Sequence, residues 1–259
     1  MTSEPARAFP GWNWQDPDSL AERMDEFSAS IARCDKLEQL APRLPRTRAE
    51  LAGHGVTGIE FAAFRTEHPS GLATDLAPLT GPDGAAELGP LYRVDGESLF
   101  TRLDVGEPLP FADGSLDWAY AEHLIEHVTL PVAIRWLAEV RRVLAPGGLL
   151  RLTTPDLRIY IEGYRDEDRF FAKHRRRLEV MQVGPPMPER KAFMLNQIFY
   201  LYGHRWIYDL DELTFALAEA GFDVSKVRSC GFRTGERPDV AALDTTFRRD
   251  ETMYVEATA

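Results

Sequence analysis

The chain has 259 residues and a formal net charge of −11 at pH 7. Such an acidic chain does not complement the phosphates of nucleic acids or an anionic membrane surface, so we expect neither as a partner. Two cysteines, Cys34 and Cys230, cannot form a disulfide framework. With no leader-like apolar segment and no apolar run long enough to span a bilayer, the sequence predicts a cytoplasmic protein.

Residues 1–54 are predicted to form an N-terminal arm and one helix. Residues 1–18 are rich in Pro and Trp, and Trp12 and Trp14 are candidates to close over a pocket. Ser19 and Glu22 have capping-box spacing at a helix start. The apolar residues that follow recur every three or four positions, the spacing of one helix face (Leu20, Met24, Phe27, Ile31 and Cys34). We expect Pro42 and Pro45 to end this helix.

Residues 55–259 alternate between strand and helix patterns. Short apolar runs predict strands at 56–61, 72–76, 98–104, 116–121, 149–153, 222–229 and 253–257. Amphipathic spacing predicts helices over Leu130 to Leu144 and from Asp209 to Gly221. This alternation is typical of an α/β protein with a mostly parallel sheet.

The stretch 156–208 interrupts this alternation and contains ten aromatic residues. It follows a parallel strand, where α/β sheets open their ligand crevice. It is therefore either a lid inserted over a substrate pocket or a helical subdomain that uses aromatics for its own small core.

The segment LPFADGSLDWAYAEHLIEHV (109–128), followed by EVRRVLAPGGLL (139–150), carries a family resemblance. It resembles the class I S-adenosylmethionine-dependent methyltransferases that act on small molecules, with a weaker match at 204–222. The resemblance implies a Rossmann-like, seven-stranded, mostly parallel sheet with helices on both faces and an antiparallel last strand. It also implies methyl transfer from S-adenosylmethionine to an oxygen or nitrogen of a small molecule, as in natural-product biosynthesis.

The resemblance also assigns cofactor residues to strand ends. The first strand and its turn supply Glu60, Ala62 and Phe64, and the second strand supplies Asp75 for the ribose hydroxyls, a role that a two-oxygen acceptor suits. The ends of the third and fourth strands supply the other cofactor-binding positions (Asp104, Val105 and Ala121). Asp75 is alternatively a turn or cap residue.

The first turn departs from the family, because Ala62 and Ala63 stand where glycines are usual. Glycine allows positive φ and close backbone approach, and alanine in such a position costs about 1 kcal/mol. Two alternatives to methyl transfer therefore stay open. One is a repurposed fold that catalyses a cofactor-independent cyclisation, elimination or intramolecular substitution. The other is a non-catalytic partner subunit, and a homodimer is a further expectation.

The run His123-Leu-Ile-Glu126-His127 has the spacing of an inverted zinc-protease motif. On a helix its two histidines would share one face, as metal ligands do. The sequence offers no evident third ligand, so we expect no metal. We expect instead that a histidine takes a proton from the substrate. The candidate catalytic residues are Glu122, His123, His127, Tyr202 and His204.

Aromatic and basic residues before the Asp209 helix are candidates for substrate binding. Arg205 has the planar fork that binds a carboxylate, although arginines near helix starts are often structural. The remaining candidates in the aromatic stretch are Tyr160, Tyr200 and Trp206.

Overall fold

A computed structural model describes residues 31–165, 170–181, 190–200 and 202–259. The predicted arm with Trp12 and Trp14, and the predicted helix up to Phe27, lie outside the described residues. Within the described ranges, no helix is long and apolar enough to cross a membrane.

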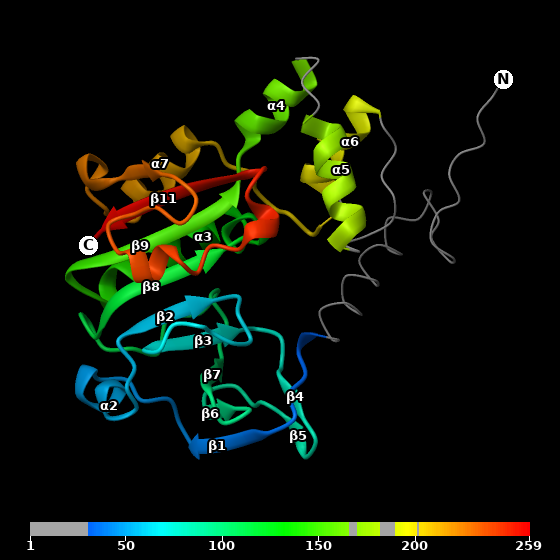
Figure 1. Cartoon of the computed structure of the whole chain (residues 1–259). Helices are drawn as coiled ribbons and strands as arrows, with labels where there is room; N and C mark the ends of the chain where they lie inside the picture. Colours follow the sequence, from blue (N-terminus) through cyan, green and yellow to red (C-terminus); the bar gives the residue numbers. More distant parts are fainter. Residues whose placement is uncertain (1–30, 166–169, 182–189, 201) are drawn as a thin grey trace.

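A nine-stranded sheet forms the centre of the molecule (Figure 1), in the order β1-β6-β7-β3-β2-β8-β9-β11-β10. Five neighbouring strands are parallel: β7 (Ser98–Arg102), β3 (Gly71–Asp75), β2 (Gly58–Phe61), β8 (Leu116–Glu122) and β9 (Leu144–Pro155). The predicted mostly parallel α/β fold is therefore confirmed.

Both edges of the sheet are antiparallel. On one side, β11 (Thr252–Thr258) pairs antiparallel with β9 and β10 (Arg228–Cys230), as predicted for the last strand. On the other side, β6 (Leu91–Val94) and β1 (Leu37–Ala41) add two antiparallel strands beyond β7. The predicted count of seven strands is therefore wrong. Residues 37–41 form a strand before Pro42, where the sequence predicted the end of a helix.

The connection from β2 to β3 is unusually short. Only residues 62–70 join these two parallel neighbours, and within that fully described stretch there is no helix. Parallel strands ordinarily need a crossover of a dozen or more residues, usually a helix. Strands also replace a helix between β3 and β7, where β4 (Thr80–Gly81) and β5 (Gly84–Ala85) form a hairpin ahead of β6.

One face of the sheet is covered as the fold class predicts. Helices α3 (Leu130–Val143) and α7 (Leu210–Glu219) contact each other and bury their apolar sides in the main core with Phe61, Ala121 and Leu152. Thr47, which caps the short helix α2 (Arg48–Gly53), forms a capping box with Glu50. Asp209 caps α7 by accepting from the Glu212 amide, as its sequence predicted.

The opposite face departs from the prediction of helices on both sides. Next to β3 and β7, residues flanking the β4–β5 hairpin, Leu79 and Ala86, pack on Ala73 and Phe100. Next to β8, the four-residue helix α8 (Pro238–Ala241) places Val240 on Trp118. Gly58 is required here, because a Cβ on it would fall 2.0 Å from the Trp118 ring.

Three helices lie beyond the end of the sheet to which β9 points (Figure 1): α4 (Leu157–Arg165), α5 (Phe170–Met181) and α6 (Lys191–Tyr200). They share a separate apolar cluster of Tyr160, Phe170, Phe171, Leu178, Met194 and Ile198. Part of the aromatic surplus therefore builds a small core, as in one of the two alternatives left open, while Tyr164, Phe199, Tyr200 and Trp206 are exposed.

Two predicted elements differ further. The predicted strand 222–229 is instead a 3-10 turn, η2 (Val224–Lys226), followed by the short β10. Residues 125–127 also form a 3-10 turn, η1 (Ile125–His127), so His123 and His127 do not share an α-helical face. Helix α8 and a third 3-10 turn, η3 (Thr246–Arg248), were not predicted.

Candidate functional site

The predicted cofactor residues gather at the carboxyl ends of β2, β3, β7 and β8. Phe61 pairs with Thr74 on one side and with Ala121 on the other, and the Leu103 amide donates to the Asp75 carbonyl. Four adjacent strands thus bring together positions that lie up to 61 residues apart in the sequence. Ligands of open α/β sheets bind at this edge.

The turn after β2 has the backbone that the family's glycine pattern implies. Ala62 has φ +53°, a left-handed conformation that L-residues other than Asn and Asp rarely adopt. The following residue returns to the sheet, with the Ala63 amide donating to the Thr74 carbonyl. Phe64 packs against Phe100, with ring centroids 6.4 Å apart. Its ring is therefore used in packing, in a position predicted to bind cofactor.

Asp75 and Asp104 each close a short turn. One Asp75 carboxylate oxygen accepts from the Ala77 amide at 2.8 Å, and one Asp104 oxygen accepts from the Gly106 amide at 2.8 Å. This is the turn role left open for Asp75, and it leaves the second oxygen of each carboxylate for other partners. Burial raises the pKa of Asp75.

Glu60 and Glu122 project from the face opposite α3. Burial raises the pKa of Glu60 to about 7, against which the Thr66 hydroxyl acts, while the nearby Glu122 charge raises it further. One Glu122 oxygen accepts from the Thr245 amide at 3.0 Å. Ala121 points to the other face and lies in the main core, against which Val105 also packs. A cofactor could therefore meet only the backbone of Ala121.

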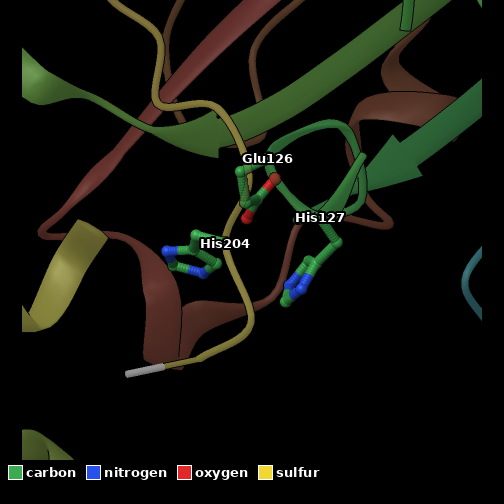
Figure 2. Close-up of side chains that lie close together, drawn as sticks. All are labelled: Glu126, His127 and His204. Carbon is green, nitrogen blue, oxygen red and sulfur yellow. The ribbon is translucent and has the colours of Figure 1, made fainter. Parts of the chain in front are cut away.

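Four of the five candidate catalytic residues line one cavity beyond the end of β8 (His123, His127, Tyr202 and His204), whereas Glu122 does not. Figure 2 shows two of the four, His127 and His204, together with Glu126. The backbone carbonyl of Glu126 accepts from the amides of Arg205 at 2.6 Å and Trp206 at 3.2 Å. These bonds fasten the segment after α6 to the turn after β8 and place His204 beside His127, with ring centroids 4.9 Å apart. One ligand atom from each of Glu126, His127 and His204 lies within 4.8 Å of the others. The sequence missed this third ligand, because it lies 77 residues away.

His123 belongs to the support of this cluster. It adopts φ +51°, and its Nε2 lies 2.8 Å from the Thr252 hydroxyl. Because that hydroxyl donates to the Arg248 carbonyl at 2.6 Å, it accepts from Nε2–H of His123. The other ring nitrogen, Nδ1, lies 3.1 Å from Glu126 Oε1. A strained backbone held by such partners is typical of functional sites.

A cavity of about 110 Å³ adjoins the cluster and is lined by His123, His127, Pro155, His174, Leu178, Ile198, Tyr202, His204, Arg248 and Glu251. At about 30 Å³ per water molecule, it has room for a few waters or a small polar group. The Tyr202 hydroxyl is buried and has no hydrogen-bond partner among the described residues. Burial, reinforced by the Glu251 charge, raises the pKa of Tyr202 above its ordinary value. Tyr202 therefore stays a neutral hydroxyl.

The electrostatics of the cluster keep its imidazoles neutral and its carboxylate ionised. Desolvation lowers the pKa of His127 and His204, an effect that the Glu126 charge opposes. Burial acts to raise the pKa of Glu126, yet the surrounding histidines, first His123, hold it well below its usual range. The His127 side chain is partly open to solvent and also lines the cavity.

The four predicted substrate residues do not converge. Tyr160 is fully buried, and its hydroxyl donates to Glu251. Tyr200 is 75% exposed and Arg205 is exposed. Trp206 donates from its indole N–H to Glu212 at 2.8 Å. The structure gives Tyr160 and Trp206 structural partners and brings none of these four into the cavity lining.

Three polar or charged cavity residues were missed: His174, Arg248 and Glu251. His174 is in the basic run KHRRR, and the other two are in RRDE before the last strand. Such charged runs are typical of solvent-facing segments, so the sequence carried no signal for them. Their position depends on α5 and on the segment before β11 meeting over the end of β8.

A comparison with known protein families matches one continuous part of the chain. Residues 72–152 match a methyltransferase domain. The matched segment runs from β3 to β9 and includes Asp75, Asp104, Ala121 and the turn with Glu126 and His127. The expected resemblance to class I S-adenosylmethionine-dependent methyltransferases is thereby confirmed for this part of the chain.

The individual relatives are distant or partial. An uncharacterized 37.1 kDa protein in transposon TN4556 of Streptomyces fradiae is 40% identical over 91 residues, which cover 33% of this chain and 26% of that protein. This chain therefore spans about a quarter of that relative. An S-adenosylmethionine-dependent methyltransferase from Mesorhizobium loti is 16% identical, with 82% and 96% of the two chains covered and a TM-score of 0.41. One from Archaeoglobus fulgidus is 13% identical, with 82% and 92% covered and a TM-score of 0.42.

Proposed function

We propose that this protein transfers a methyl group from S-adenosylmethionine to an oxygen or nitrogen of a small molecule, in the cytoplasm. The observation that carries the proposal is the meeting of Asp75, Asp104 and the left-handed Ala62 turn at one edge of the parallel strands, beside the histidine cluster. The methyltransferase-domain match covers this edge from β3 onward. In this arrangement the cofactor lies over the ends of β2, β3 and β7, and the methyl acceptor lies toward the end of β8.

The chemistry asked of the protein is mainly alignment. The acceptor atom must lie in line with the methyl carbon and its leaving sulfur, and holding that geometry supplies much of the rate enhancement. The carboxylates of Asp75 and Asp104 each retain one oxygen to accept from ribose or adenine donors. His127 and His204, neutral at pH 7, are the groups placed to take a proton from the acceptor. S-adenosylmethionine itself supplies the activated methyl group.

The helices α4, α5 and α6 fit a cover over the acceptor side. They lie beyond the end of β9, and α5 is held to the chain before β11 through Arg177, which lies 2.9 Å from Asp250. We expect these helices to gain hydrogen-exchange protection when S-adenosylhomocysteine and acceptor bind, since segments that gate a pocket open readily. Protection in the free protein equal to that of β8 and β9 would make them a static subdomain.

A cofactor-independent reaction is the second candidate function. The nine-residue connection after β2 offers no helix N-terminus for the cofactor, and the Phe64 ring fills space beside Phe100. Calorimetric titration of the full chain with S-adenosylhomocysteine separates the two. Saturable binding at micromolar to sub-millimolar concentration supports methyl transfer. A folded protein that fails to bind at millimolar S-adenosylmethionine would instead favour cyclisation, elimination or intramolecular substitution.

A further inference from the structure

Glu126, His127 and His204 form a set of side chains with the chemistry of a metal site. Two imidazoles and one carboxylate are the ligands that divalent transition metals such as zinc take in open sites, where solvent completes the coordination. Their ligand atoms lie within 4.8 Å of one another. Bonds of about 2.1 Å around a tetrahedral ion place ligand atoms about 3.4 Å apart, so small side-chain rotations suffice to close the set.

The surrounding hydrogen bonds prepare each ligand. His204 Nδ1 lies 2.6 Å from the Ile198 carbonyl and must donate to it, which leaves the lone pair of Nε2 available. This carbonyl–histidine arrangement orients metal-binding imidazoles. The ring of His127 makes no hydrogen bond within the described part of the chain, and it lines the cavity. Each ring therefore keeps a nitrogen lone pair available to bind a cation.

Glu126 is the strongest sign that a cation belongs here. Its side chain is completely buried, and its Oε2 accepts from the Thr154 hydroxyl at 3.0 Å. Its Oε1 lies 3.1 Å from His123 Nδ1 but has no hydrogen bond of good geometry among the described residues. A buried carboxylate is costly unless it is paired or coordinates a metal. The wall of the cavity supplies a second, partly buried carboxylate, Glu251, to offset the charge of the Arg248 guanidinium that also lines it.

We propose that Glu126, His127 and His204 bind a divalent transition-metal ion of the zinc type, with its remaining coordination positions open to the adjoining cavity. The sequence led us to expect no metal because it offered no third ligand, and the fold supplies that ligand in His204. The buried, unpartnered Tyr202 hydroxyl faces the same cavity, where a metal-bound water or substrate oxygen would lie. A metal at this point would lower the pKa of a bound hydroxyl or water. With the metal bound, His127 and His204 act as ligands, and this effect replaces their direct role as proton acceptors in the proposed methyl transfer.

Metal binding can be measured on the full-length protein without cofactor or substrate. The protein is purified without a chelating resin, stripped with EDTA, and titrated with Zn²⁺ by calorimetry and with Co²⁺ by visible absorption. We expect one equivalent of either ion to bind, with Co²⁺ giving the bands of a nitrogen-containing site. The His127→Ala and His204→Ala variants should each bind at least about 100-fold more weakly, since loss of a direct ligand exceeds the 10–100-fold effect of an outer-shell partner.

Two further variants make the test specific. His54→Ala removes an exposed imidazole outside the cluster and should leave Zn²⁺ affinity unchanged. His123→Ala removes only a neighbour of Glu126 and should weaken binding about tenfold. Thermal unfolding checks that each variant is folded. His127→Ala should disturb packing least, because His127 is exposed. Absence of one-equivalent binding by the wild type, or equal Zn²⁺ affinity in wild type and folded His127→Ala, would overturn the proposal. Neither result depends on S-adenosylhomocysteine binding.

Discussion

The two halves of the sheet connect their parallel strands in different ways. From β8 onward, helices α3 and α7 cover one face in the pattern that an α/β sequence predicts. Between β2 and β7, a nine-residue loop and a β4–β5 hairpin replace the crossover helices, and strands β6 and β1 extend the edge. The half with regular crossovers holds the histidine cluster, and the half with short connections holds the cofactor candidates other than Ala121 on β8. The comparison shows that parallel strands can keep their order, and their carboxyl ends can stay at one edge of the sheet, when short loops and hairpins replace the crossover helices.

The largest effect that would test this comparison lies in the regular half. Arg151 on β9 is fully buried, and its guanidinium forms two hydrogen bonds with Asp244, at 2.9 and 2.6 Å, and one with Glu256 at 2.8 Å. Arg151→Met should lower the free energy of unfolding by about 3–5 kcal/mol, because two buried carboxylates lose their partner. Urea denaturation measures this. Arg158→Met, in an exposed pair with Glu162, should change it by less than about 0.5 kcal/mol.

A smaller effect is expected from Glu60 at the border between the halves. Its folded-state pKa of about 7 lies above its ordinary 4.5, so the folded protein binds this proton more tightly than the unfolded chain does. The resulting penalty is absent below about pH 4.5 and complete above about pH 7. Glu60→Gln should therefore stabilise the protein by up to about 3 kcal/mol at pH 8, from 1.36 kcal/mol per unit, and far less at pH 5.

The matched control for this pH dependence is Glu97→Gln, which changes an exposed glutamate. Its free energy of unfolding should follow the wild type at both pH values. Should Glu60→Gln give the same change at pH 5 and pH 8, burial would not govern the ionisation of Glu60. The border between the halves would then be more open to water than the structure indicates.

In the half with short connections, Asp75→Ala should weaken S-adenosylhomocysteine binding by about 1.5–3 kcal/mol, the contribution of hydrogen bonds to a charged acceptor. Loss of the turn bond to the Ala77 amide should affect stability less. Calorimetric titration of the wild type and the variant measures their affinities for S-adenosylhomocysteine, and thermal unfolding measures their stabilities. Equal affinities in the two titrations would remove Asp75 from the cofactor site and leave it a turn residue.

The smallest effect concerns Ala62. Its φ of +53° is available to glycine at little cost, so Ala62→Gly should relieve up to about 1 kcal/mol of backbone strain. If the turn is a working cofactor loop, S-adenosylhomocysteine binding should tighten by up to that amount. The control is Ala63→Gly, at a neighbouring position where φ is not positive. Tightening by both substitutions alike would point to general loosening of the loop.

What the sequence by itself determined was local. Apolar runs and the motif from 109 to 150 predicted β8, α3 and β9, because period and turn chemistry are properties of neighbouring residues. The spacing that starts at Asp209 predicted the start of α7 for the same reason. The resemblance predicted the acidic strand ends of the cofactor side. The absence of a helix between β2 and β3 and the strands that replace a helix between β3 and β7 were not predicted.

The tertiary structure decided which distant residues meet. His204 joins Glu126 and His127 only because the amides of Arg205 and Trp206 bond to the Glu126 carbonyl. The cavity beside them closes with Arg248 and Glu251, from a charged run that resembles a solvent-facing turn. Sequence spacing specifies period and local hydrogen bonds, whereas contacts between segments depend on how the sheet edges and helices pack. For that reason the metal ligand set proposed here emerges from the fold and not from the H-x-x-E-H spacing alone.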